Sequence, residues 1–355
     1  MSLQLQTPPD FFVWIQTGFL GDIILTTAAM QLAKKKFKKI KHILITTPVG
    51  ASALGREPVI DHVIAWDKRK DGALAGFKSI KQQLDHIIAG GSAVILQAHS
   101  SARSSLLCKY LGRPTIAYKE AKLSFLADYK IPRLAAYHEA HRIGLLLEPF
   151  GLSRDEICAS RPQLTPTGVG RGLEAIRSKA KFLVGIAPGS VWGTKRWPAE
   201  RFAGLVKTIL EQTDWSVVLL GAPSDKEQSD IVVQSQTPAS SSERMIDLVG
   251  KTSIAELVDV YNSLDLVVSN DSSPVHYASA LDKPIVSIFG ATVPALGFYP
   301  LTRSAPAEVV EVKNLPCRPC SDHGPQTCPI GHFDCMKQIS VDMLWQRIQS
   351  VASQL

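Results

Sequence analysis

A run of small polar residues between two apolar segments suits the binding of an anion. Residues 269–290 are SNDSSPVHYASALDKPIVSIFG, and Asn270 to Ser273 form the polar run. Pro274 favours the first turn of a helix, which Ser272 or Ser273 would cap. Free backbone N–H groups at a helix start bind phosphate, and His276 in the first turn would point to the same place. An ordinary helix cap with an unremarkable histidine is the alternative.

A glycine-rich loop with a lysine follows another apolar segment. Residues 186–198 are IAPGSVWGTKRWP. The ammonium of Lys195 can reach a diphosphate, and the hydroxyls of Ser190 and Thr194 add hydrogen-bond donors. The spacing is not that of a P-loop. Two anion-type loops in one half of the chain are stronger evidence for a phosphate site than either loop alone.

The first half of the chain has a carboxylate in a glycine-walled turn. In QTGFLGDIILTTAAM, residues 16–30, Gly18 and Gly21 bracket a strand-to-helix turn and Asp22 follows at once. The glycine spacing and the second acid of a dinucleotide-binding fold are missing. Asp22 is therefore either a helix cap that interacts with the helix dipole or a general base that serves the phosphate-binding half.

Apolar, β-branched runs alternate with helix-period segments and must position these loops. The expected strands cover residues 11–16, 42–47, 62–67, 92–97 and 115–118, then 182–187, 215–220, 245–250, 265–270 and 284–289. Continuous apolar strands separated by helices are typical of parallel sheets covered on both faces. We expect two βα domains with a linker near 160–180, and a ligand cleft at the carboxyl ends of the strands.

Composition is consistent with two domains and an anionic partner. The chain has 355 residues, 45% of them hydrophobic, and a formal net charge of +7. Such a charge favours phosphates, nucleic acid or an anionic membrane face. No basic, aromatic-rich strand suggests base stacking, so we do not expect nucleic acid. The start lacks the pattern of a secretory signal and no long apolar run occurs, so a cytoplasmic location is expected.

Several of these motifs together resemble the lipopolysaccharide heptosyltransferases of glycosyltransferase family 9, and more closely the heptosyltransferase II type. The segments are GFLGDIILTT, PGSVWGTKRWP, SNDSSPVHYASAL and CRPCSDHGPQTCPIGHFDCM, in the family's order over nearly the whole chain. The resemblance implies an α/β GT-B fold, with two Rossmann-like domains of mainly parallel sheets that face each other across a cleft. It also implies ADP-heptose as donor, inversion at the anomeric carbon and no catalytic metal.

The resemblance and the residues themselves together suggest roles for individual positions. Asp22 matches the family's base, and Lys195 would stabilise the leaving diphosphate as the second catalytic residue. The expected donor-binding residues are Ser190, Thr194, Asp271, Ser272, Ser273 and His276, with Asp225 or Glu227 as candidates for the ribose. The expected acceptor-binding residues are Gly21, Arg69 and Arg103, on a basic rim that includes Lys68, Lys70 and His99. Ser273 replaces a glycine of many relatives, so the donor sugar stays open.

An inverting transfer gives these residues a common mechanism. A base takes the proton of the acceptor hydroxyl as the anomeric carbon is attacked, and Asp22 would supply it. Positive charge must stabilise the leaving diphosphate. Lys195 and the helix start at 272–276 would provide it in place of magnesium, so no cofactor is required for catalysis.

Four cysteines near the C-terminus resemble a zinc-ribbon fragment. They are Cys317, Cys320, Cys328 and Cys335, with two, seven and six residues between them and two histidines within the segment. The first spacing suits a metal knuckle, whereas the last is unusual. A structural metal and reduced structural thiols are both open, and a cytosolic disulfide is not expected.

The expected organisation follows from these assignments. Residues 1–165 would bind the acceptor and residues 180–340 the nucleotide sugar, followed by a helix at 341–355 for which packing on the N-terminal domain is one option. The acceptor would be the Kdo and heptose inner core of lipopolysaccharide, reached by peripheral contact of a monomer with the cytoplasmic face of the inner membrane. The alternatives are another nucleotide sugar, a protein acceptor or a catalytically silent binding module. Intact Asp22 and Lys195 favour an enzyme.

Overall fold

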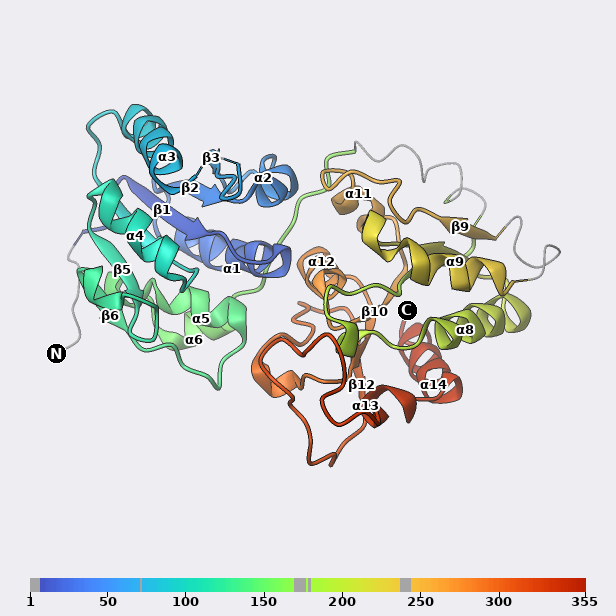
Figure 1. The fold of residues 1–355 in the computed structure, drawn as a ribbon. Coiled ribbons are helices and arrows are strands. Elements are labelled where there is room, and N and C mark those ends of the chain that lie inside the picture. The colour runs from blue at the N-terminus through green and yellow to red at the C-terminus, as the bar shows by residue number, and fades with distance from the viewer. Residues whose placement is uncertain (1–6, 71, 169–176, 178–179, 237–243) are drawn as a thin grey trace. The chain divides into compact units, whose positions relative to one another are not determined.

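The chain divides into two compact units, residues 1–165 and 166–355 (Figure 1). The computed structural model describes residues 7–70, 72–168, 177, 180–236 and 244–355. Much of the linker expected near 160–180 lies outside the described residues. Each unit is an α/β sandwich around one parallel sheet.

The first unit is built on six parallel strands. They are β1 (Phe11–Gln16), β2 (Lys41–Thr46), β3 (His62–Ala65), β4 (Ala93–Gln97), β5 (Thr115–Tyr118) and β6 (Tyr129–Ile131). The helices are α1 (Leu20–Lys36), α2 (Pro48–Leu54), α3 (Ala73–Ile88), α4 (Ala102–Leu111), α5 (Glu139–Leu145) and α6 (Arg154–Ala159). The strand order is β3-β2-β1-β4-β5-β6.

Side-chain alternation along β1 explains why both faces of this sheet are covered. Every residue of β1 is buried. Phe11, Val13 and Ile15 belong to a core cluster with apolar residues of α3 and α4. On the opposite face, Phe12 packs edge-on against Phe150, and α1 and α5 adjoin. A strand buried on both faces must be apolar throughout, as its sequence is.

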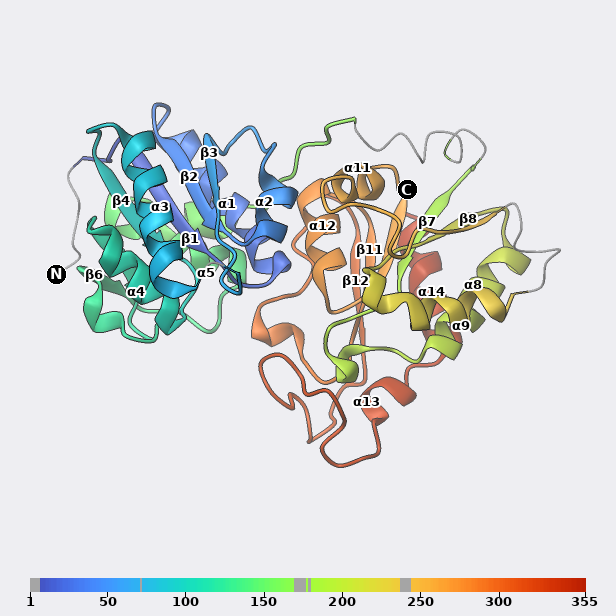
Figure 2. The same ribbon diagram turned by 45° about the horizontal axis from the view of Figure 1, so that its top comes forward.

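The second unit repeats the design. Its strands are β7 (Leu183–Ala187), β8 (Ser216–Leu219), β9 (Met245–Asp247), β10 (Leu266–Asn270), β11 (Ile285–Phe289) and β12 (Ala307–Glu311), in the order β12-β11-β10-β7-β8-β9. Its helices are α8 (Ala199–Gln212), α9 (Lys226–Gln234), α11 (Leu257–Asn262), α12 (Ser273–Leu281), α13 (Asp334–Lys337) and α14 (Val341–Ala352). Helices α11 and α12 lie along one face of the sheet, and α8, α9 and α14 along the other (Figure 2).

The apolar stripe of the C-terminal helix is buried in the core of the second unit. Leu344, Trp345, Ile348 and Val351 of α14 are buried in the same core cluster as α8. Nε1 of Trp345 also donates to Oε1 of Gln212 at 3.0 Å. The apolar stripe of α14 therefore completes the core of this unit.

Each sheet has the same topological switch point. In each unit the second and third strands add on one side of the first strand, and the fourth strand adds on its other side. The fourth strands are β4, which pairs with β1, and β10, which pairs with β7. In open parallel sheets, ligands bind at the carboxyl ends of the strands at this point. The site described next occupies that position in the second unit.

Candidate active site

Asn270, the last residue of β10, holds the loop that follows β7 to the end of this strand. Its Oδ1 accepts a hydrogen bond from the backbone N–H of Trp197 at 3.0 Å, and its Nδ2 donates to the carbonyl of Pro188 at 2.8 Å. The side chain is fully buried. A buried amide whose hydrogen bonds are satisfied stabilises the ends of the 188–197 loop against the strand. Sequence reasoning placed Asn270 in the polar run without this role.

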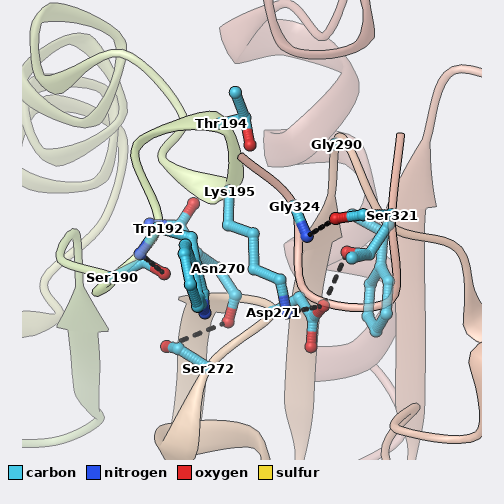
Figure 3. A network of polar contacts seen from close by, with 12 residues as sticks. Ser190, Trp192, Thr194, Lys195, Asn270, Asp271, Ser272, Gly290, Ser321 and Gly324 are labelled. Atoms are coloured by element: carbon cyan, nitrogen blue, oxygen red, sulfur yellow. Dashed lines mark hydrogen bonds and ion pairs between the residues drawn. The ribbon is translucent and has the colours of Figure 1, made fainter. Parts of the chain in front are cut away.

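Lys195 and Asp271 form an ion pair at this strand edge. The Lys195 ammonium lies 2.7 Å from Oδ2 of Asp271, and the two side chains are 11% and 5% exposed (Figure 3). The hydroxyl of Thr292 donates to the same carboxylate oxygen at 2.6 Å. The structure thus brings Lys195, predicted to be catalytic, and Asp271, predicted to bind the donor, together, and it adds Thr292, which the sequence analysis missed. A polar residue just past the predicted strand 284–289 was the available signal.

Helix α12 starts without a side-chain cap. Ser272 stands at the capping position with an extended backbone, but its side chain makes no capping hydrogen bond, and its hydroxyl donates to the carbonyl of Asn270 at 3.4 Å. Ser273 and Pro274 follow in the first turn. The ordinary cap that we considered as the alternative is therefore not formed by Ser272. The positive end of the helix dipole points to the neighbourhood of Lys195.

His276 lies buried in the first turn of α12, close to both charges. Burial lowers the pKa of His276 to about 4, Asp271 opposes this shift and Lys195 adds to it. Its Nδ1 has no hydrogen-bond partner in the part of the chain that the structure describes. The ring is therefore neutral at neutral pH, and its hydrogen bond to a phosphate would not be assisted by a formal charge, unlike that of Lys195.

The other predicted donor residues lie on the same loops. Ser190 is buried, and its Oγ accepts a hydrogen bond from the backbone N–H of Trp192 at 3.3 Å. The hydroxyl of Thr194 donates to the carbonyl of Pro325 at 2.5 Å, so it serves a loop contact in this structure. Of the two ribose candidates, Asp225 packs against Gly189 in the 188–197 loop, called the lysine loop below. A β-carbon added to Gly189 would come 2.1 Å from Cγ of Asp225. Glu227 is exposed on α9.

In the first unit, Asp22 lies in the first turn of α1, next to Gly18 and His99. A β-carbon at Gly18 would come 3.1 Å from Oδ2 of Asp22 and 3.4 Å from Cδ2 of His99. Nδ1 of His99 lies 3.0 Å from the hydroxyls of both Thr17 and Ser104. These bonds fix the ring so that its Cδ2 edge borders the same space as the Asp22 carboxylate.

Positive charge gathers near this carboxyl end of the first sheet. Lys68 is half-buried and donates to the carbonyl of Thr17 at 2.8 Å. Burial, with a contribution from Arg103, lowers the pKa of Lys68 to about 8. Burial and the charge of Lys68 lower the pKa of His99 to about 4, so the ring is neutral at neutral pH. Arg69 and Arg103 are exposed, whereas Gly21 is buried within α1.

The four C-terminal cysteines carry free thiols in this structure. The Cys317 sulfur lies 3.9 Å from Nε2 of His332. No three histidine, cysteine or acidic side chains are arranged to hold a metal ion, as far as the described residues go. Of the helices that the structure describes, none combines the length and the apolar character that a membrane crossing requires.

Comparisons with known proteins agree on one family. The profile of glycosyltransferase family 9 (heptosyltransferase) matches residues 93–327. Lipooligosaccharide heptosyltransferase 2 of Campylobacter jejuni subsp. jejuni serotype O:6 is 25% identical over 353 residues, which cover 96% of this chain and 99% of the relative.

Two solved structures share the fold over nearly the full length. The ADP-heptose lps heptosyltransferase II of E. coli has a TM-score of 0.75 at 17% identity and covers 97% of this chain and 98% of its own. The family 9 glycosyl transferase of Veillonella parvula DSM 2008 has a TM-score of 0.79 at 21% identity, with coverage of 100% and 99%. The expected GT-B fold is confirmed. The family profile spans more than half of the chain, and the chain belongs to glycosyltransferase family 9, the heptosyltransferases.

Proposed function

We propose that this enzyme transfers a heptose from ADP-heptose, with inversion, to the Kdo and heptose inner core of lipopolysaccharide. The observation that carries the proposal is the buried ammonium of Lys195 beside the uncapped start of α12. Both favour a diphosphate, and a nucleoside diphosphate is the leaving group of such a donor. The names of the relatives in Campylobacter and E. coli support heptose as the sugar.

The proposed reaction is a single displacement. Asp22 takes the proton of the acceptor hydroxyl while its oxygen forms a bond to the anomeric carbon. The bond between this carbon and the diphosphate oxygen breaks from the opposite side, and its electrons leave with ADP. Lys195 stabilises the negative charge that develops on the diphosphate. The start of α12 adds its dipole, and neutral His276 adds a hydrogen bond, so we propose that no metal is required.

The same proposal assigns the two halves of the chain. Residues 180–340 would bind the nucleotide sugar through Ser190, Asp271, Ser272, Ser273 and His276, with Asp225 toward the ribose. Residues 1–165 would bind the acceptor through Gly21, Arg69 and Arg103. The charges of the two arginines complement the carboxylates and phosphates of an inner core. Thr194 would act through its loop contact. We propose a monomer that works in the cytoplasm in peripheral contact with the inner membrane.

The decisive experiment compares wild type with Asp22→Asn. Purified protein is mixed with ADP-heptose and a Kdo-terminated lipid A acceptor, and released ADP and the anomeric configuration of the product are measured. We expect wild type to form an inverted heptoside and Asp22→Asn to turn over about a hundred- to ten-thousand-fold more slowly with unchanged ADP affinity. Near-normal turnover of the variant would reject Asp22 as base. A wild type that binds ADP-heptose without turnover on any acceptor would indicate the silent binding module.

A further inference from the structure

Residues 317–335, which carry the four C-terminal cysteines and are called the cysteine segment below, make contacts that neither a bound metal nor reduced structural thiols would explain. Arg318 lies between Cys317 and Cys320, and its side chain is only 4% exposed. Its guanidinium donates to the carbonyl of Thr292 at 2.7 Å and to that of Phe289 at 3.1 Å, and it also contacts the carbonyl of Gly290. These carbonyls belong to the end of β11 and the loop that follows it.

The same guanidinium reaches the neighbouring strand. It donates to the carbonyl of Val312 at 2.5 Å and pairs with Glu311, the last residue of β12, at 3.0 Å. A planar guanidinium can satisfy several acceptors at once, which an ammonium cannot do in the same geometry. Arg318 therefore fixes the 289–292 loop against β12.

That loop holds the ion pair of the donor site. Thr292, whose carbonyl accepts from Arg318, uses its hydroxyl to hold Oδ2 of Asp271. Asp271 in turn holds the Lys195 ammonium through the same oxygen. A continuous series of short polar contacts thus runs from Arg318 to Lys195, although these two side chains have no direct hydrogen bond between them among the bonds described.

Farther along the segment, Pro325 and Gln326 form hydrogen bonds with the loop that carries Lys195. The carbonyl of Pro325 accepts from the backbone N–H of Thr194 at 3.2 Å as well as from its hydroxyl. The side-chain amide of Gln326 accepts from the N–H of Gly193 at 3.1 Å and donates to the carbonyl of Val191 at 3.1 Å.

A glycine allows this close approach. Gly324 has a φ of +77°, and an added β-carbon would come 2.9 Å from the hydroxyl of Thr194. It would also lie 3.6 Å from Cγ of Lys195. The backbone of the cysteine segment is therefore packed on the stem of the lysine.

We propose that Arg318 and Thr292 are positioning residues for the donor diphosphate, which place the Lys195 ammonium through Asp271. The inference rests on the proposed function, because it assumes that Lys195 binds the diphosphate. It gives the cysteine segment a role in catalysis that requires neither a metal nor a disulfide. Arg318 holds the 289–292 loop, and Pro325 and Gln326 bind residues 191–194 beside Lys195.

The experiment measures ADP and adenosine affinity by calorimetry for Thr292→Val, Thr292→Ser and Arg318→Lys. Valine keeps the shape of threonine and removes the hydroxyl, whereas serine keeps the hydroxyl. We expect Thr292→Val and Arg318→Lys to weaken ADP binding about three- to tenfold, the range of one net hydrogen bond. Thr292→Ser should bind ADP within about twofold of wild type, and adenosine affinity should be unchanged throughout.

Matched controls separate positioning from a loss of stability. The hydroxyl of Thr208 donates to a backbone carbonyl within α8, so Thr208→Val loses a comparable bond away from the site. The guanidinium of Arg244 donates to the carbonyls of Leu210, Thr213 and Trp215, which makes Arg244→Lys the control for Arg318→Lys. Both controls should leave ADP affinity unchanged.

A double-mutant cycle with Lys195→Met provides the strictest test. If Thr292 acts through Lys195, Thr292→Val should change ADP affinity less than about twofold in the Lys195→Met background. The same factor in both backgrounds would overturn the inference, as would wild-type ADP affinity in Thr292→Val. If Lys195→Met itself binds ADP normally, the proposed donor site fails and the inference fails with it. If Lys195→Met weakens ADP binding as expected but the Thr292 and Arg318 variants bind ADP like wild type, the inference is rejected and the proposed donor site stands.

Discussion

Replacing Lys195 by methionine removes the ammonium and keeps an unbranched side chain in its place. The side chain is 11% exposed, so water screens its charge little and a bound diphosphate would interact with it at short range. A hydrogen bond to a charged group contributes about 1.5–3 kcal/mol. The variant should therefore bind ADP roughly ten- to a hundred-fold more weakly, while adenosine, which has no phosphate, binds as before.

The free protein should also lose stability. Once the ammonium is gone, the buried carboxylate of Asp271 keeps only the Thr292 hydroxyl as a hydrogen-bond partner among the residues that the structure describes. Breaking a buried ion pair by removing one partner costs about 3–5 kcal/mol. Calorimetric titrations should therefore be run well below the melting temperature of the variant, with circular dichroism to show that it is folded.

Lys207→Met is the matched control. Lys207 lies on α8 of the same unit, its side chain is 62% exposed, and its partner Glu211 is 3.9 Å away. Such a surface pair contributes little, so this variant should match wild type in ADP affinity and nearly match it in stability. Lys195→Met with wild-type ADP affinity would refute the reasoning, because the ammonium would then face no phosphate.

Three further outcomes are expected. Gly18→Ala should lower turnover on the order of tenfold with a small change in melting temperature, because the new methyl group meets Asp22 and His99, and normal turnover would show that this space is not used. The free energy of unfolding, measured with urea, should fall by about 1.4 kcal/mol per pH unit for each of His42, His99 and His276 as the pH drops from about 6.5 toward 4. The sign follows because the folded pKa is depressed, so only the unfolded state takes up protons in this window, and a flat profile would contradict it. Elemental analysis should find no stoichiometric metal, and transfer should survive chelation; one equivalent of zinc or iron would show that the cysteines bind metal.

The buried strands were predictable because a strand covered on both faces is apolar along its whole length. All the expected strands are present, and their ends lie within three residues of the predicted ones. The missed strands are β6 and β12, which lie at the edges of the two sheets. Six of their eight residues are half-exposed or exposed, and neither strand shows a continuous apolar run. The opposite edge strands β3 and β9 are as exposed but were predicted, because apolar residues extend past them at 62–67 and 245–250, whereas β6 and β12 are short segments with a charged residue between apolar ones.

The candidate site was predictable by residue type but not by pairing. Glycines, hydroxyls and one lysine at strand ends indicate an anion site, and Lys195 stood out on that basis, whereas Asp271 was assigned to donor binding through the family resemblance. Their ion pair depends on β10 lying beside β7, which is a crossover between strands far apart in the sequence. Thr292 and Arg318 come from a third strand end and from the cysteine segment. Local pattern carries no information about which of these segments meet.

The two switch points have a similar local construction, and each presents a different group to the proposed reaction. In the first unit, Thr17 after β1 and His99 after β4 join the two loops at 3.0 Å, and Asp22 lies in the helix that follows. In the second, Asn270 at the end of β10 holds the loop after β7, and Lys195 lies on that loop. One repeated βα framework thus presents a carboxylate in one unit and an ammonium in the other. A base is needed where a proton leaves, and a cation where a diphosphate leaves, so the difference in charge at equivalent places divides the proposed reaction between the two units.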